Sequence, residues 1–161
     1  MNDENPKYNS VDMARYLVAY ANEHGFTINM TKLQKLLYIA YGTYLAPKNR
    51  RLINEHPQAW PYGPVFQTTR DKLLKKNLSG IRSSDQGLET IKNDNEVQAL
   101  LKLVFDSFGS KTATTLTVWS HQSGSPWDRV SSQEGFTWGE IIPDKYIQEY
   151  FNSILIRNGG N

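Results

Sequence analysis

An apolar stripe between residues 31 and 46 constrains this sequence more than any other feature. Its apolar residues recur every three or four positions, which places them on one face of an α-helix. Thr31 and Gln34 have the spacing of a capping box at the helix N-terminus, and Pro47 is expected to end the helix. We therefore predict a central core helix. Its stripe consists of Leu33, Leu36, Leu37, Ala40 and Tyr44.

The same periodicity predicts several more helices around this one. Ser10 and Ser110 are suited to cap two of them, and Gly25 stands where a left-handed residue ends a helix. Pro64 is expected at the first position of a third helix, since proline is favoured there. The expected helices cover residues 10–23, 64–76, 97–108, 110–119 and 143–155.

The segments between these helices predict only a little β-structure. Short apolar pairs within residues 52–60 indicate a minor β-hairpin, followed by a turn at residues 61–64. Residues 77–95 are polar and form a connector, in which residues 88–91 could be a short strand. We predict a mainly α, compact single domain of five or six helices over residues 10–157. Residues 1–9 and 158–161 are expected to be flexible termini.

Composition excludes several classes of protein. The 161 residues include no cysteine, so disulfides and thiolate metal sites are absent and a reducing compartment is expected. Residues 1–10 are polar, unlike a secretory signal, and no apolar run approaches the roughly 20 residues that cross a bilayer. A cytoplasmic protein without a membrane partner is expected. The net charge of +2 is too small to indicate nucleic-acid binding by itself.

Catalytic and cofactor motifs are not evident. The three histidines, His24, His56 and His121, lack the spacing of a zinc site, and the sequence contains no phosphate-binding glycine loop. Ser120, His121 and Asp128 could be imagined as a hydrolytic triad, but adjacent helical residues point in different directions. We expect His121 to pack against Trp127 and stabilise the turn at Pro126. The sequence thus predicts neither an enzyme nor a cofactor, and a small hydrolase is the least favoured reading.

Two basic clusters are candidates for a partner-binding rim. One follows the central helix and the other lies on the third expected helix. Each cluster is explained at least as well by a solvated face with cations near a helix C-terminus. If both lie on one side of the fold, a positive rim for an acidic partner or for nucleic acid becomes the better explanation. The clusters are Lys48, Arg50 and Arg51, and Arg70, Lys72, Lys75 and Lys76.

Four motifs, taken in order, resemble the Panacea antitoxin domain family, which includes phage-associated GepA-type and SocA-like proteins. The resemblance covers residues 10–129, with a looser match at Ile147 and residues 150–151. Each motif alone is modest, but their order and spacing are specific. The motif residues are Leu33, Gln34, Lys35, Leu36, Leu37 and Tyr38; Trp60; Tyr62, Gly63 and Pro64; and His121, Pro126 and Trp127.

The resemblance implies an antitoxin that neutralises a cognate protein toxin by direct contact. SocA-like members also imply a second role, that of an adaptor which delivers the toxin to a protease. A third reading is a DNA-binding autoregulator, for which the basic third helix is the only support. The connector at residues 77–95 departs from the common pattern, and variable surface segments often set specificity. The oligomeric state does not follow from the sequence.

Overall fold

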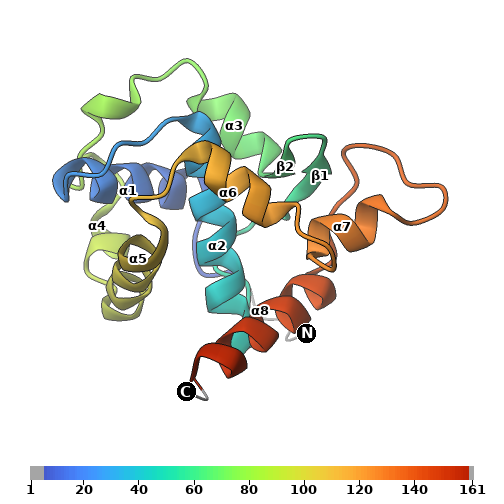
Figure 1. Cartoon of the computed structure of the whole chain (residues 1–161). Helices are drawn as coiled ribbons and strands as arrows, with labels where there is room; N and C mark the ends of the chain where they lie inside the picture. Colours follow the sequence, from blue (N-terminus) through green and yellow to red (C-terminus); the bar gives the residue numbers. More distant parts are fainter. Residues whose placement is uncertain (1–5, 160–161) are drawn as a thin grey trace.

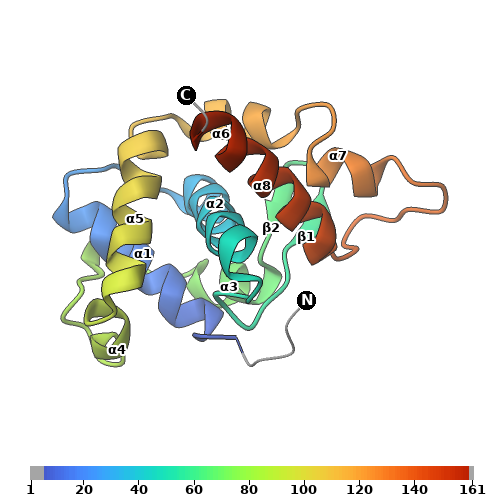
Figure 2. The ribbon, with the colours of Figure 1, turned by 90° about the horizontal axis from the view of Figure 1, so that it is seen from below.

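Helix α2 (Met30–Lys48) runs through the middle of the molecule, and the other helices pack around it (Figures 1 and 2). The computed structural model describes residues 6–159, with side chains through Ile154. The predicted mainly α class is confirmed, and the described residues also form a minor two-stranded antiparallel hairpin at one side. The remaining helices are α1 (Ser10–Glu23), α3 (Gln67–Leu73), α4 (Glu89–Lys92), α5 (Asn95–Phe108), α6 (Ala113–Ser120), α7 (Pro126–Ser131), α8 (Asp144–Gly159) and the short 3₁₀ helix η1 (Leu78–Gly80).

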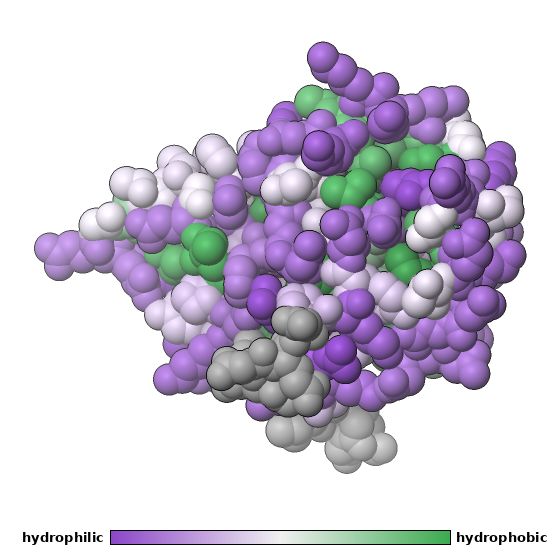
Figure 3. All heavy atoms as spheres, turned by 180° about the vertical axis from the view of Figure 1, so that it is seen from behind, coloured by the Kyte–Doolittle hydropathy of each residue, from purple (hydrophilic) through white to green (hydrophobic). Residues whose placement is uncertain are grey.

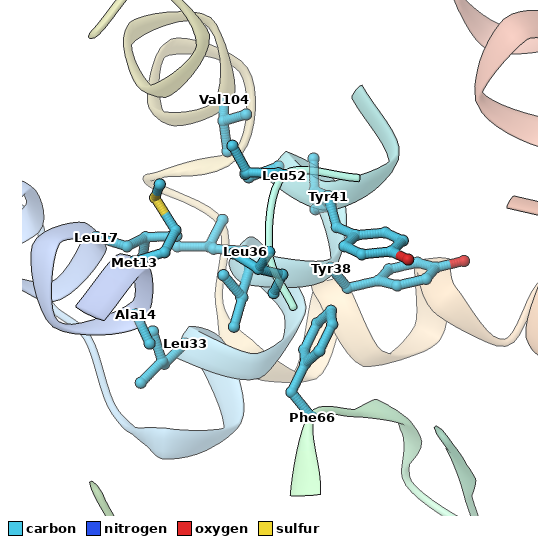
Figure 4. Close-up of a cluster of buried hydrophobic side chains, with 14 of the residues drawn as sticks. Met13, Ala14, Leu17, Leu33, Leu36, Tyr38, Tyr41, Leu52, Phe66 and Val104 are labelled. Carbon is cyan, nitrogen blue, oxygen red and sulfur yellow. The ribbon is translucent and has the colours of Figure 1, made fainter. Parts of the chain in front are cut away.

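The predicted stripe of α2 lies at the centre of the core. Leu33, Leu36 and Leu37 are fully buried, and α2 contacts α1, α5, α6 and α8. Figure 4 shows side chains of α1 on one side of Leu36 and the rings of Tyr38 and Tyr41 on the other. Burial continues around nearly the whole helix and includes the polar side chains of Lys32, Gln34 and Lys35.

Helix α8 packs on α2 through a close approach that the apolar pattern did not reveal. A Cβ atom on Gly42 would lie 2.3 Å from ring atoms of Phe151. Only a glycine leaves room for the ring at this position. The expected apolar residues Ile147 and Phe151 are buried, whereas Leu155 lies beyond the described side chains.

The hairpin lies at residues 58–65, closer to the C-terminus than the predicted residues 52–60. Strand β1 (Gln58–Trp60) pairs with β2 (Gly63–Val65), and the turn lies at residues 61–62. Ile53 instead forms a parallel bridge with Tyr8, whose N–H donates to the carbonyl of Leu52 at 3.0 Å. Tyr8 is thereby fixed to the domain, although the sequence places it in a flexible terminus. Residues 1–5 and 160–161 lie outside the described chain.

Helix α3 begins at Gln67, so the prediction that Pro64 opens it is wrong. Pro64 lies in β2, and the chain stays extended through Phe66 because the amide of Gln34 binds the backbone of Phe66. The carboxylate of Glu55 then accepts hydrogen bonds from the N–H groups of Thr68 and Thr69, at 2.5 and 3.2 Å. These bonds satisfy amides at the start of α3.

The predicted helix caps are displaced by one or two residues. Asn9, Asn29 and Thr112 cap α1, α2 and α6, in place of Ser10, Thr31 and Ser110. In each case the capping side chain belongs to an extended residue just before the helix, the backbone geometry that an N-cap requires. The predicted capping box therefore does not form, since Gln34 is engaged by Phe66.

The polar connector is folded against α1. Asn22 donates to the carbonyls of Leu78 and Ile81 at 2.9 and 3.0 Å, and Glu23 accepts from Ser83. The short strand predicted at residues 88–91 is instead the start of α4, with Leu88 as the N-cap and residues 89–91 in the helix. Leu88 and Ile91 are both buried, and residues three apart share a face of a helix rather than of a strand.

Pro47 does not end the central helix as predicted. Helix α2 continues to Lys48, and its C-cap, Asn49, adopts a left-handed conformation with φ 53°. The N–H of Asn49 still reaches the carbonyl of Leu45 at 2.8 Å. The predicted left-handed residue after α1, Gly25, has φ 79°.

Seen from behind, the surface of the molecule is mostly hydrophilic, with hydrophobic residues in small separate patches (Figure 3).

Candidate functional site

The motif segments meet beside the first half of α2. Gln34 forms a reciprocal pair with Phe66, whose N–H donates to Oε1 at 2.8 Å while Nε2 donates to the carbonyl at 3.4 Å. This pair holds the end of the β-hairpin against α2. The side chain of Gln34 thus pairs with the backbone of Phe66 as a neighbouring strand residue would. This pairing fixes the hairpin relative to α2.

Lys35, the next residue, has the most unusual environment in the described chain. Its side chain is only 1% exposed, and its Nζ lies without a hydrogen-bond partner among the described residues. A Cβ atom on Gly63 would lie 3.0 Å from Lys35 Cε and 3.0 Å from Ser120 Oγ. The buried ammonium is therefore confined between the hairpin turn and the end of α6.

His121 and Trp127 pack as predicted. Their rings stack with centroids 4.0 Å apart, at the junction of α6 and α7. The indole N–H of Trp127 donates to the carbonyl of Trp60 at 2.7 Å. Pro126 is buried at the first turn of α7, where Ser125 caps the helix. These contacts tie the last motif to β1, so the four motifs form one continuous cluster.

A pocket of about 360 Å³ opens next to Lys35. Its walls combine motif residues with residues of α3 and the start of α2. Tyr62, 47% exposed, stands at the hairpin turn, and Arg70 is half-buried. The pocket is therefore largely apolar and has two cationic groups. It is lined by Met30, Thr31, Gln34, Lys35, Tyr62, Val65, Arg70 and Leu74.

Burial changes the proton affinities in this cluster. It lowers the pKa of the Lys35 ammonium to about 8, because the charged form loses its hydration. Burial, and then the nearby charge of Lys35, lower the pKa of His121. One ring nitrogen of His121, Nε2, is buried without a partner among the described residues. The site therefore disfavours additional positive charge.

The remaining motif residues belong to the scaffold. Leu33, Leu36 and Leu37 fill the core, and Tyr38 packs edge-on against Trp119 and Phe151. Trp60 lies in β1, while Gly63 and Pro64 are buried in β2. Among the predicted site residues, Gln34, Lys35, Tyr62 and Arg70 line the pocket.

The two basic clusters differ in where their members lie along α2. Lys48 ends α2 and pairs with Glu96, whereas Arg70 lines the pocket that includes Met30 at the other end of α2. A 19-residue helix is about 28 Å long, which separates Lys48 from Arg70, whereas the loop after Arg51 returns to the start of α3 through Glu55. Arg51 contacts His56 at 3.3 Å, and Arg50 lies nearby in sequence, half-buried. Lys72, Lys75 and Lys76 are exposed on and after α3.

The imagined triad is not assembled. The hydroxyl of Ser120 donates to the carbonyl of Thr117 at 2.8 Å, and Asp128 accepts from the N–H of Gly124 at 2.9 Å. Within the described part of the chain, no three His, Asp or Glu side chains converge as metal ligands. Nor does any helix among the described residues have the length and apolarity needed to cross a membrane.

The sequence matches the family model described as "Antitoxin SocA-like, Panacea domain" over residues 33–128. The chain belongs to the SocA-like Panacea family. It is also 30% identical over 154 residues to Antitoxin SocA of Caulobacter vibrioides, covering 86% of the chain and 80% of that antitoxin. No solved structure matches it. The Panacea match spans all four motifs, from the first residue of the α2 motif to the residue after Trp127.

Several residues of this Panacea site are not distinguished by the sequence. Met30, Val65 and Leu74 read as ordinary apolar residues, and Trp138, which stacks on Trp127 with ring centroids 6.0 Å apart, lies in no predicted element. Only the chain's return between α7 and α8 brings Trp138 there. The N–H of Gly139 donates to the carbonyl of Ala59 at 2.8 Å, and no periodic pattern in the sequence predicts that contact.

Proposed function

We propose that this protein is an antitoxin that neutralises a protein toxin by binding it directly. The observation that carries the proposal is membership of the SocA-like Panacea family, together with 30% identity to Antitoxin SocA over most of both chains. The proposed partner is a protein encoded beside this one. The proposed location is the cytoplasm, where such a toxin would be made.

The geometry of the site is suited to recognition. The motif cluster presents a partly open pocket with an exposed aromatic ring, Tyr62, and a half-buried cation, Arg70, at its walls. Tyrosine and arginine are enriched at the centres of protein interfaces. The groups that could have formed a nucleophilic triad are instead engaged in local hydrogen bonds. A binding role, without turnover, accounts for this arrangement.

The test combines rescue of growth with measurement of a complex. The candidate toxin is the product of the adjacent gene, expressed from an inducible promoter with and without this protein. We expect toxicity that co-expression relieves, and co-elution of the two purified proteins in size-exclusion chromatography. Rescue without a complex would contradict direct neutralisation.

The same experiment separates the two other roles. A protease adaptor would lower the toxin's lifetime in cells, and rescue would disappear when the protease is deleted. An autoregulator would bind operator DNA with an affinity that falls steeply with added salt, since phosphate contacts release counterions. Direct neutralisation predicts rescue at unchanged toxin levels and without operator DNA.

A further inference from the structure

Two lysines, one turn apart on α2, differ in a way that points to a ligand. Lys32 and Lys35 are both buried, at 8% and 1% exposure. The ammonium of Lys32 donates to the carbonyl of Gly109 at 2.5 Å, so its burial is compensated within the fold. The ammonium of Lys35 lies without such a partner among the described residues. An uncompensated buried charge is costly, and folded proteins normally pair it.

Lys35 also lines a pocket of substantial size, and Lys32 lines a separate one of about 300 Å³. The volume of the Lys35 pocket, about 360 Å³, is ample for an amino-acid side chain, and its walls include Tyr62 of the hairpin turn and Arg70 of α3. Arg70 contributes a second cation, whose charge is partly offset by Asp71 at 3.8 Å. The other walls, from Met30, Val65 and Leu74, are apolar. A ligand that fits must therefore combine one negative charge with some apolar surface.

We propose that this pocket is a binding site for a carboxylate, held by Lys35 at its base and Arg70 at its side. A monovalent carboxylate matches the single uncompensated ammonium. A phosphate group, which carries a charge of about −1.5 to −2 near neutral pH, would introduce an excess of negative charge between apolar walls. The methylene groups of a glutamate or aspartate side chain suit those walls, and arginine is well adapted to carboxylates.

The source of the carboxylate is an acidic side chain of the protein partner, a step that rests on the proposed function. Tyr62 at the turn and Arg70 on α3 give the pocket wall an exposed interface-forming ring and a positive charge. A buried charge pair at an interface fixes the register of the two proteins. Binding of the toxin would then supply the counter-charge that Lys35 does not find in the described chain.

The chemistry of the pocket is testable without a toxin. Lysine side chains are labelled with ¹³C and ¹⁵N, and N-acetyl-glutamate is titrated into the intact protein at constant ionic strength, with chloride and inorganic phosphate as comparison anions. We expect saturable shifts of the Lys35 signals with N-acetyl-glutamate and none of the Lys32 signals. Phosphate binding more tightly than the carboxylate, or no saturable response at Lys35, would overturn the assignment.

The partner arm uses matched variants. Lys35→Met and Lys32→Met each replace a buried lysine by an uncharged side chain of similar length, and circular dichroism verifies that both fold. We expect Lys35→Met to weaken the toxin complex by about tenfold or more and Lys32→Met to leave it nearly unchanged. Arg70→Gln, at a half-buried position, is a second probe if Lys35→Met does not fold.

The outcomes separate this inference from the proposed function. If wild-type protein forms no toxin complex, direct neutralisation fails, while the titration still decides the chemistry of the pocket. If the complex forms equally well with Lys35→Met and Arg70→Gln, direct neutralisation stands. The carboxylate that the pocket binds then does not come from the protein partner. A third outcome is saturable binding of N-acetyl-glutamate by the wild type together with unchanged toxin affinity in the variants. It would overturn the assignment of the carboxylate to the partner and would assign the pocket to a free carboxylate.

Discussion

The ammonium of Lys35 lies so close to Gly63 that a methyl group on Gly63 would come within 3.1 Å of Nζ. Gly63 itself has φ 117°, which other residues rarely adopt. The hairpin turn and the buried lysine therefore constrain each other. This relationship connects two motifs that lie 28 positions apart in the sequence, and it leads to the first prediction.

Gly63→Ala is expected to destabilise the protein by about 2–4 kcal/mol, from backbone strain and from crowding of Lys35 and Ser120. Gly124→Ala is the matched control, since Gly124 has φ 83° and no atom within 4 Å of an added Cβ. The free energy of unfolding is measured by urea denaturation. Equal losses in the two variants would show that the crowding at Gly63 is without energetic effect.

The contact between Gly42 and Phe151 gives a second prediction. Gly42→Ala places a methyl group on the ring, and we expect a loss of about 1–3 kcal/mol even though alanine favours helices by up to about 1 kcal/mol. Phe151→Leu removes ring atoms from the same space. A double-mutant cycle by thermal or urea unfolding should therefore show strong favourable coupling. Additive effects would mean that α8 relaxes away from Gly42.

Stability should depend on pH through Lys35. Burial lowers its pKa to about 8 from an ordinary value of 10.5. Between these values the unfolded chain holds one more proton at this site, so the free energy of unfolding rises with pH. The slope approaches about 1.4 kcal/mol per pH unit in the middle of this range. Below pH 8 both states are protonated, and the destabilisation is complete.

Urea denaturation at several values between pH 8 and pH 10 tests this expectation. Lys35→Met should remove most of the rise that the wild type shows. Burial also lowers the pKa of Lys32, so Lys32→Met should remove a smaller part of the rise. The range stops at pH 10 because tyrosines with raised pKa values, such as the partly buried Tyr8, act in the opposite direction above it. Parallel curves for wild type and Lys35→Met would contradict the charged, buried state of Lys35.

The exposed lysines on α3 and just after it should affect how fast the partner associates. Lys72→Glu and Lys76→Glu reverse charges that lie beside α3, and charges at an interface rim act within a Debye length of about 8–10 Å. We expect slower association with toxin and a weaker salt dependence, with little change in dissociation. Lys145→Glu, on α8, is the charge-matched control. Surface plasmon resonance at two salt concentrations distinguishes the rates.

The sequence predicts the central helix because Leu33, Leu36 and Leu37 repeat with helical spacing, and it predicts the stacking of His121 on Trp127 because a turn separates them. It does not predict where α3 begins. The preference of proline for a first helical position is a local effect, and it is overridden at Pro64 by the bond between Gln34 and Phe66, which lie 32 residues apart.

Only part of the candidate site can be predicted from the sequence. The motif resemblance singles out Lys35 and Gly63, but nothing in the local pattern shows that the ammonium is buried or that Arg70 lies across the same pocket. These properties depend on contacts between distant segments. The basic residues illustrate the same point, since the sequence does not show that Lys48 and Arg70 lie near opposite ends of α2.

The most direct test of the account is the binding isotherm of this protein with the purified product of its neighbouring gene. The account predicts a saturable complex that abolishes the toxin's activity at the stoichiometry of binding and is weakened by Lys35→Met but not by Lys32→Met. Growth rescue in cells without any detectable complex in solution, together with tight binding to operator DNA, would contradict it.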